Sequence, residues 1–358
     1  MSKTKHSGLN ILRIFVMLQI VYGHFMLYGG IKERMINEGG INKLIYYLFF
    51  FTSRCPVYIL IALSGYFLIQ KTDIVQYCKK KIINTWIVML FYSFVISFII
   101  VTAVLLYKGE AGIKPVAKNF ISGVTPFLGN KWYYMTNYIL VLAVAPIINV
   151  GLSKVSQKYY TIILAGGLFV LSAWPVLSGL SDLFSMNYII DHLEGKSFLN
   201  FVYMYMLGGY IAKYGSEFKC PKILSAGIFV LSAVANTILV YMIPSYLEYA
   251  KFNDNFLSII QCVCLILFFK NIKINSVIIN KISKGNIGVY LITEHGAIRS
   301  YLWSKLNAEL IWSENKFIIW INIFLIVVVV YLLSNIAEQI RALVSNKMHK
   351  VKTAGYKV

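Results

Sequence analysis

The sequence alternates long apolar runs with short polar segments. A transmembrane helix needs about 20 mostly apolar residues to cross a hydrocarbon core of about 30 Å. Ten runs meet or approach the required length: residues 9–28, 44–70, 82–107, 131–151, 159–178, 197–213, 222–243, 255–270, 285–303 and 316–338. The sixth and eighth of these runs are short, and the ninth contains charged residues. The pattern predicts an all-α fold, a polytopic membrane helix bundle with about ten transmembrane helices.

The polar segments are too short to form a second domain. We therefore predict one transmembrane domain over residues 1–338 and a basic cytoplasmic tail at 339–358. The first run follows two lysines, as in a signal peptide, but it is long and no small-residue cleavage site follows it. We interpret it as a retained first span. The pairs Gly166-Gly167 and Gly208-Gly209 indicate close packing between helices.

Composition narrows the class of protein further. The 358 residues are 58% hydrophobic and 13% charged, which excludes a disordered chain. The formal net charge is +20, from 34 Lys+Arg against 14 Asp+Glu. Apolar runs interrupt these basic residues, which argues against a soluble nucleic-acid-binding protein, and no nucleic-acid partner is expected. The five cysteines match no metal motif, so no metal is expected.

The distribution of charge predicts how the chain is oriented. Ten spans place both termini on the same side of the membrane. With the termini inside, the inner segments hold 20 basic and three acidic residues, and the outer segments hold 11 basic and ten acidic residues. Cytoplasmic loops carry an excess of Lys and Arg, so we predict that both termini are cytoplasmic. The positive net charge then results mainly from the excess of basic residues in the cytoplasmic segments.

Six ionisable residues fall inside the predicted spans, where a charged side chain is costly and marks a functional candidate. Arg13 and His24 lie eleven residues apart on the first run. This spacing places them on one helix face, about 16 Å apart along the axis. The others are Arg54 on the second run, with Pro56 expected to kink that helix, and Glu294, His295 and Arg299 on the ninth.

Three predicted helices thus carry ionisable groups at or near mid-depth. They suggest one buried polar site with a base (His24 or His295), an acid (Glu294) and two cations (Arg54 and Arg299). On the ninth run, Arg299 follows His295 by one turn on the same face. Structural alternatives stay open: Arg13 snorkelling to lipid phosphate, His24 bonded to a neighbouring helix, or Arg54 as counter-ion to Glu294. Spacing alone does not separate a transporter from an enzyme.

Several motifs together resemble the acyltransferase 3 family of integral membrane acyltransferases. Arg13, ten intervening residues and His24 are similar to the signature of the family's first span. The other similar segments are Arg54-Cys55-Pro56-Val57 with Ser64-Gly65-Tyr66, Trp132-Tyr133-Tyr134 with Pro146, Gly288-Val289-Tyr290-Leu291-Ile292, and Arg299 with Trp303. Their order fits along nearly the whole chain, and the last spacings are typical of members from Gram-positive bacteria.

The resemblance implies a bundle of about ten spans in a bacterial plasma membrane. It implies transfer of an acyl group, usually acetyl from acetyl-CoA, to a sugar hydroxyl. His24 then matches the family's essential histidine and Arg13 its partner arginine. Residues expected to line the same site or to bind acyl-CoA are Arg54, Ser64, Tyr66, Lys80, Lys81, Trp132, Tyr290 and Arg299.

Two segments depart from the family pattern. Lys79-Lys80-Lys81-Ile82-Ile83-Asn84 stands where many members have Arg-x-x-Arg, and lysine lacks the bidentate fork of arginine. Thr293 stands where many members have histidine, and it is followed by Glu294 and His295.

The favoured hypothesis is an O-acyltransferase that uses acetyl-CoA as co-substrate. The inner lysines and Arg13 would attract acetyl-CoA, and His24 would deprotonate the acceptor hydroxyl or carry the acetyl group itself. Arg54, Arg299 or Tyr66 would stabilise the oxyanion. The expected partners are acyl-CoA, a surface polysaccharide or lipid-linked glycan, and membrane lipid. The alternative is a transporter or exporter of a polysaccharide or lipid-linked sugar. A different membrane acyltransferase fold with an Asn/His pair fits worse, because the key histidine lies on the first span.

Overall fold

The computed structural model describes residues 7–110, 112–126, 132–175, 177, 195–217 and 220–355, and these residues contain helices and no strands. The first half of the chain holds α1 (Ser7–Tyr28), α2 (Ile31–Glu38), α3 (Gly40–Thr52), α4 (Pro56–Leu68), α5 (Ile74–Ser93), the π-helical η1 (Phe94–Ile100), α6 (Val101–Tyr107), α7 (Ile113–Val124), α8 (Tyr133–Ser153), α9 (Gln157–Leu168) and the π-helical η2 (Phe169–Ala173). The all-α prediction is confirmed for this part of the chain.

The second half continues in the same manner. It holds α11 (Phe198–Tyr214), α12 (Lys222–Met242), the 3₁₀ turn η4 (Pro244–Tyr246), α13 (Leu247–Ala250), α14 (Phe256–Lys270), α15 (Val277–Lys284), α16 (Asn286–Thr293), α17 (Gly296–Lys305), α18 (Ala308–Ile311) and α19 (Lys316–Gly355). The predicted boundary at residue 338 falls inside α19, which continues as a helix through the basic tail to Gly355.

Within the described residues, six helical segments are long and apolar enough to cross a membrane. They are Ser7–Tyr28, Gly40–Leu68, Ile74–Tyr107, Tyr133–Ser153, Lys222–Met242 and Lys316–Asn346, and α14 is a shorter apolar helix. The membrane-protein class is thereby supported. The count of ten spans and the cytoplasmic position of the termini stay predictions.

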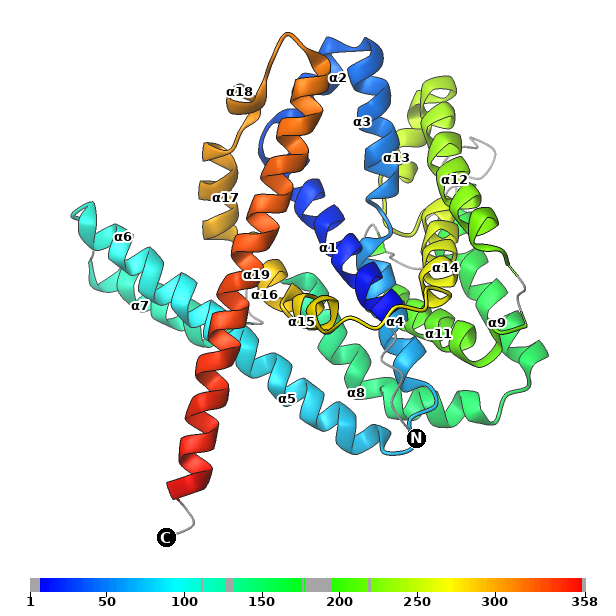
Figure 1. Cartoon of the computed structure of the whole chain (residues 1–358), viewed down its shortest axis with the longest axis horizontal. Coiled ribbons are helices and arrows are strands. Elements are labelled where there is room, and N and C mark those ends of the chain that lie inside the picture. The colour runs from blue at the N-terminus through cyan, green and yellow to red at the C-terminus, as the bar shows by residue number, and fades with distance from the viewer. Residues whose placement is uncertain are drawn as a thin grey trace.

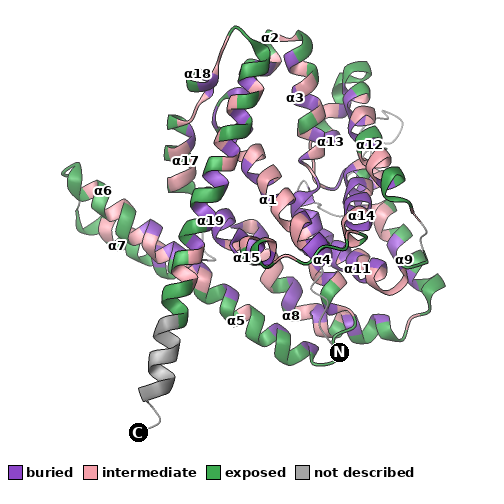
Figure 2. Cartoon of the chain, viewed as in Figure 1, coloured by how far each residue is buried: buried purple, intermediate pink, exposed green. Residues whose placement is uncertain are grey.

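Helix α1 occupies the centre of the bundle (Figure 1). It contacts α4, α14, α15, α16, α17 and α19. Its side chains Leu12, Val16, Val21 and Phe25 are fully shielded from solvent. Burial is concentrated in α1, α4, α11 and α14, whereas α6 and α7 project from the bundle with mostly exposed or half-buried residues (Figure 2). Ionisable groups on α1 therefore face other helices, where a charge needs a partner or a cavity.

Helices α4 and α11 pack closely against each other. A Cβ added at Gly208 would lie 1.8 Å from the carbonyl oxygen of Ala62, and one added at Gly65 would lie 1.9 Å from that of Tyr205. Only glycine permits backbones to approach this closely. Close packing is confirmed for Gly167, Gly208 and Gly209, but the prediction was wrong for Gly166, which has nothing within 4 Å of its Cβ position.

Two predicted spans are broken helices. The run 44–70 divides into α3 and α4 around Ser53–Cys55, with Pro56 in the first turn of α4. The run 285–303 divides into α16 and α17 at Glu294 and His295. A proline has no N–H to donate to the preceding turn, which explains the first break as a stronger form of the expected kink. Both breaks place ionisable residues in non-helical backbone.

Candidate active site

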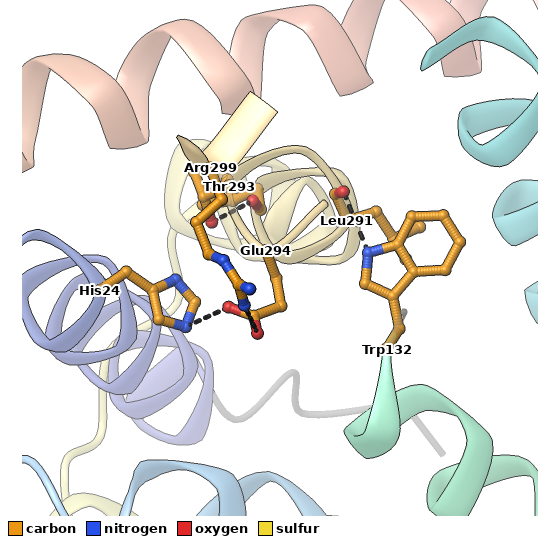
Figure 3. A network of polar contacts seen from close by, with 7 residues as sticks. His24, Trp132, Leu291, Thr293, Glu294 and Arg299 are labelled. Carbon is orange, nitrogen blue, oxygen red and sulfur yellow. Dashed lines mark hydrogen bonds and ion pairs between the residues drawn. The ribbon is translucent and has the colours of Figure 1, made fainter. Parts of the chain in front are cut away.

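The site is built where α1 faces the break between α16 and α17. Glu294 caps the C-terminus of α16, and its carboxylate lies against His24 on α1. The distance between His24 Nε2 and Glu294 Oε2 is 2.7 Å (Figure 3). The backbone N–H of Glu294 still donates to the carbonyl oxygen of Tyr290, so the last turn of α16 aims the carboxylate at α1.

Arg299 completes a three-residue cluster. Its Nη1 donates a hydrogen bond of 2.9 Å to Glu294 Oε1, the oxygen that does not face His24. The guanidinium also lies over the ring of Tyr28, 4.3 Å from the centroid. Arg299 therefore balances the charge of Glu294 and leaves its second oxygen to orient the imidazole. The Glu294 side chain is 11% exposed, so this charge has little solvent to stabilise it and depends on its partners.

The other ring nitrogen of His24 is free. Nδ1 is buried and has no hydrogen-bond partner among the described residues. Because a carboxylate only accepts, a neutral imidazole that faces Glu294 through Nε2 carries its proton on that nitrogen and its lone pair on Nδ1. A carboxylate that fixes the tautomer of a histidine is the arrangement that prepares an imidazole to act as a base.

His295 points to the opposite side of the break. Its Nε2 lies 2.9 Å from the Ser97 hydroxyl on η1, and its Nδ1 accepts a 3.3 Å hydrogen bond from the backbone N–H of Ala297 as the N-cap of α17. The ring also packs edge-on against Trp132, at 5.5 Å between centroids. Both nitrogens of His295 are thus engaged. Arg299 follows His295 by one turn, since its backbone N–H donates to the His295 carbonyl oxygen at 2.8 Å, but the two side chains have different partners: Ser97 and Trp132 for His295, and Glu294 for Arg299.

Arg54 lies at the other broken helix, beside α1. Its guanidinium stacks on Phe50 at 4.2 Å, and Nη1 donates weakly to the carbonyl oxygen of Lys251 at 3.5 Å. A Cβ added at Gly23, the neighbour of His24, would lie 3.8 Å from Nη2. Arg54 is not the counter-ion of Glu294, which pairs with His24 and Arg299. Its buried Nε has no hydrogen-bond partner in the described part of the chain, so part of this cation is available there beside His24.

A cavity of about 580 Å³ lies toward the other end of α1, where this helix begins. It contains four cations, Arg13, Lys71, Lys81 and Lys284, and no acidic residue is among its described lining residues. The wall also includes polar and aromatic groups: Ser64, Phe67, Tyr77, Thr85, Tyr134, Tyr138, Asn286 and Tyr290. Four positive charges without a carboxylate partner in the wall favour a polyanionic ligand.

Arg13 is held in this cavity by a chain of side chains. Its Nη1 donates to Asn10 Oδ1 at 2.8 Å, and the amide of Asn10 donates to Asn280 Oδ1 at 2.6 Å. Ser7 donates to the same Asn280 oxygen at 3.1 Å. Asn286 donates to the carbonyl oxygen of Arg13 at 2.6 Å. Since all these partners are neutral, the guanidinium is positioned without losing its net charge.

Two helices, α1 and α16, carry residues of both the cavity and the His24 cluster. Met17 lines the cavity and lies seven residues before His24 on α1, about 10 Å along the axis. Tyr290 lines the cavity and lies one turn before Glu294 on α16. Arg13 therefore lines the cavity and His24 belongs to the cluster, at different positions along α1.

The structure separates the candidate residues into groups. His24, Glu294 and Arg299 meet directly, Arg54 lies beside them, and Arg13, Ser64, Lys81 and Tyr290 line the cavity. Lys80, Tyr66 and Trp132 are not among the lining residues; Trp132 is fully buried and donates to the carbonyl oxygen of Leu291 at 3.2 Å. The sequence reasoning missed Lys71, Lys284 and Tyr28. Lys71 and Lys284 lie at the ends of apolar runs, and Tyr28 lies four residues after His24. These positions were the signals available in the sequence.

The fold and the site define the class of protein. It is a helical membrane bundle with a buried His–Glu–Arg cluster and a separate basic cavity. The sequence model of the acyltransferase 3 family, described as an acyltransferase domain, matches residues 6–336. The chain therefore belongs to the acyltransferase 3 family, and this membership supports a membrane acyltransferase activity. No curated protein and no solved structure matches the chain.

Proposed function

We propose that this protein transfers an acetyl group from cytoplasmic acetyl-CoA to a hydroxyl of a cell-surface polysaccharide or lipid-linked glycan. The observation that carries the proposal is the His24–Glu294 contact, with a free Nδ1, two turns along α1 from the basic cavity. The family match supports acyl transfer, and these two features supply a base and a site for an anionic donor.

The cavity suits the phosphates of coenzyme A. Arg13 offers a planar fork for bidentate contact with a phosphate, and Lys71, Lys81 and Lys284 add point charges. The predicted orientation puts this end of the bundle on the cytoplasmic side, where acetyl-CoA is found. The thioester end of the donor would then extend past Met17 and Tyr290 toward His24.

His24 supplies the base in this proposal. Nδ1 removes the proton of the acceptor hydroxyl while its oxygen attacks the thioester carbonyl carbon. The tetrahedral intermediate collapses, the carbon–sulfur bond breaks, and the imidazolium returns the proton to the leaving thiolate. The products are an acetyl ester and free CoA. Glu294 and Arg299 hold the ring in the tautomer that leaves Nδ1 free and stabilise the imidazolium when it forms.

The acceptor would approach from the opposite end of the bundle to the donor. His24 lies in the outer half of the membrane in the predicted orientation, and its side chain is 17% exposed. An acyl group taken from the cytoplasm would thereby reach a glycan at the cell surface. We propose that this membrane is a bacterial plasma membrane, as the resemblance to the family implies.

The test is acetyl transfer by the purified protein in lipid nanodiscs. We expect CoA release from radiolabelled acetyl-CoA by the wild type, and loss of this release in His24→Ala. An exporter of a polysaccharide or lipid-linked sugar predicts no CoA release, and accumulation of the sugar inside cells that lack the protein. In cells, NMR of the surface glycan should show acetyl groups that disappear with His24→Ala although the protein is still made. Unchanged acetylation in that strain contradicts the proposal.

A further inference from the structure

Tyr290 occupies the boundary between the basic cavity and the His24 cluster. It lies on α16, lines the cavity, and precedes Glu294 by one helical turn, so the two side chains project from the same face. The residue is 2% exposed. Its ring packs edge-on against Tyr134, another lining residue, at 5.2 Å between centroids. The phenol is therefore held by packing in the cavity wall, one turn before Glu294.

The hydroxyl of Tyr290 lacks an acceptor for its proton. The Oη atom is buried and forms no hydrogen bond of good geometry among the described residues. The backbone N–H of Tyr134, in the first turn of α8, lies near this oxygen. That N–H can only donate, so it leaves the proton of the phenol without a partner. A buried donor without an acceptor costs roughly 1–3 kcal/mol, which a structural role does not explain.

We infer that Tyr290 is a catalytic residue whose hydroxyl donates a hydrogen bond to the thioester carbonyl oxygen of the acyl donor. This inference rests on the proposed function. As the acceptor oxygen attacks, the carbonyl double bond opens and its electron pair moves to the oxygen, which becomes an oxyanion. The Tyr290 proton stays on the phenol and stabilises that charge. When the intermediate collapses, the carbonyl re-forms, the thiolate leaves, and His24 returns its proton to the sulfur.

The surroundings of Tyr290 suit this role. Side-chain hydroxyls of tyrosine serve as oxyanion donors when they are positioned before the reaction begins. Here Tyr134 lies in the first turn of α8, so the positive end of that helix is close to Oη and favours a negative charge that develops beside it. None of the cations considered as oxyanion donors from the sequence lines this cavity, since Arg54 and Arg299 are absent from its described wall.

The test compares Tyr290→Phe with the wild type in the nanodisc assay. The variant keeps the ring and its packing on Tyr134 and removes only the hydroxyl. We expect kcat to fall roughly 10²-fold, the scale of one lost oxyanion donor, with KM for acetyl-CoA unchanged. Thermal stability should be equal or higher, because the hydroxyl removed had no acceptor in the free protein.

Tyr160→Phe is the matched control. The Tyr160 residue is also fully buried, but its hydroxyl donates to the carbonyl oxygen of Met206 at 2.7 Å, away from the cavity. This variant should lose thermal stability and keep its kcat. A kcat of Tyr290→Phe within about twofold of the wild type overturns the inference. So does a loss of kcat accompanied by a loss of stability as large as that of Tyr160→Phe, which indicates a structural hydroxyl.

The wild type and His24→Ala separate this inference from the proposed function. A wild type that releases no CoA overturns the proposed function, and the inference with it. An active wild type, an inactive His24→Ala and an unaffected Tyr290→Phe leave the proposed function intact and overturn the inference alone.

Discussion

His24 Nε2 lies 2.7 Å from Glu294 Oε2, joining the first helix of the chain to the break between α16 and α17. Glu294 ends α16 with a helical backbone, whereas His295 has an extended backbone and caps the start of α17. The same break turns His295 toward Ser97, away from His24. Two adjacent residues thus acquire different surroundings, and only one of them faces the base that the proposed function requires.

Glu294→Gln should reduce activity strongly. The amide keeps the size of the side chain but can donate as well as accept, so it no longer fixes the proton on Nε2 of His24. Loss of an orienting carboxylate has cost a serine protease about 10⁴-fold in kcat, and we expect at least about 10²-fold here. The measurement is CoA release at saturating acetyl-CoA. Glu217→Gln, an exposed site bonded to Gln157, is the control and should keep wild-type activity. Equal rates for the two variants would contradict an orienting role for Glu294.

His295→Asn should mainly reduce thermal stability, whereas His24→Asn should abolish activity. At position 295 asparagine can still cap the N-terminus of α17, as Nδ1 does now toward Ala297. We expect that variant to keep within about tenfold of the wild-type kcat and to lose thermal stability, since Ser97 and Trp132 lose a partner. His24→Asn should be inactive. If His295→Asn is as inactive as His24→Asn while folding normally, His295 takes part in the chemistry.

Lys81→Ala should weaken donor binding, whereas Lys80→Ala should not. Lys81 lines the basic cavity and its neighbour Lys80 does not, although both carry the same charge. Removal of one phosphate contact typically costs 1.5–3 kcal/mol, so KM for acetyl-CoA should rise about tenfold or more with little change in kcat. The effect should shrink as salt is raised, because screening weakens the lost attraction. A similar rise in KM for both variants would indicate general attraction by the basic surface rather than a specific contact.

Gly208→Ala and Gly166→Ala should change stability in opposite directions. At Gly208 the new methyl group would lie 1.8 Å from a backbone oxygen of α4, so α4 and α11 would have to separate. We expect a loss of about 1–3 kcal/mol, measured as a lower unfolding temperature in detergent. At Gly166 nothing lies within 4 Å, and alanine in a helix interior should stabilise by roughly 0.5–1 kcal/mol. A stable Gly208→Ala variant would show that this helix pair tolerates a wider spacing.

The sequence by itself determined the class of protein. Long apolar runs with few charges can only be satisfied by helices in a membrane, so the all-α bundle followed from composition and periodicity. The cost of an intramembrane charge made Arg13, His24, Arg54, Glu294 and Arg299 visible as candidates. The eleven-residue spacing on α1 fixed that Arg13 and His24 share a face, because a helix has one geometry.

Tertiary structure decided which candidates work together. Whether Glu294 faces His24 or Arg54 depends on how α16 packs against α1, and nothing in the hydrophobic pattern shows that packing. The basic cavity gathers Arg13, Lys71, Lys81 and Lys284 from segments far apart in the chain. Pairing between distant segments depends on how whole helices pack. Local spacing therefore identified the charged residues as candidates. Only the packing of the helices shows that His24 faces a carboxylate and that the hydroxyl proton of Tyr290 has no acceptor among the described residues.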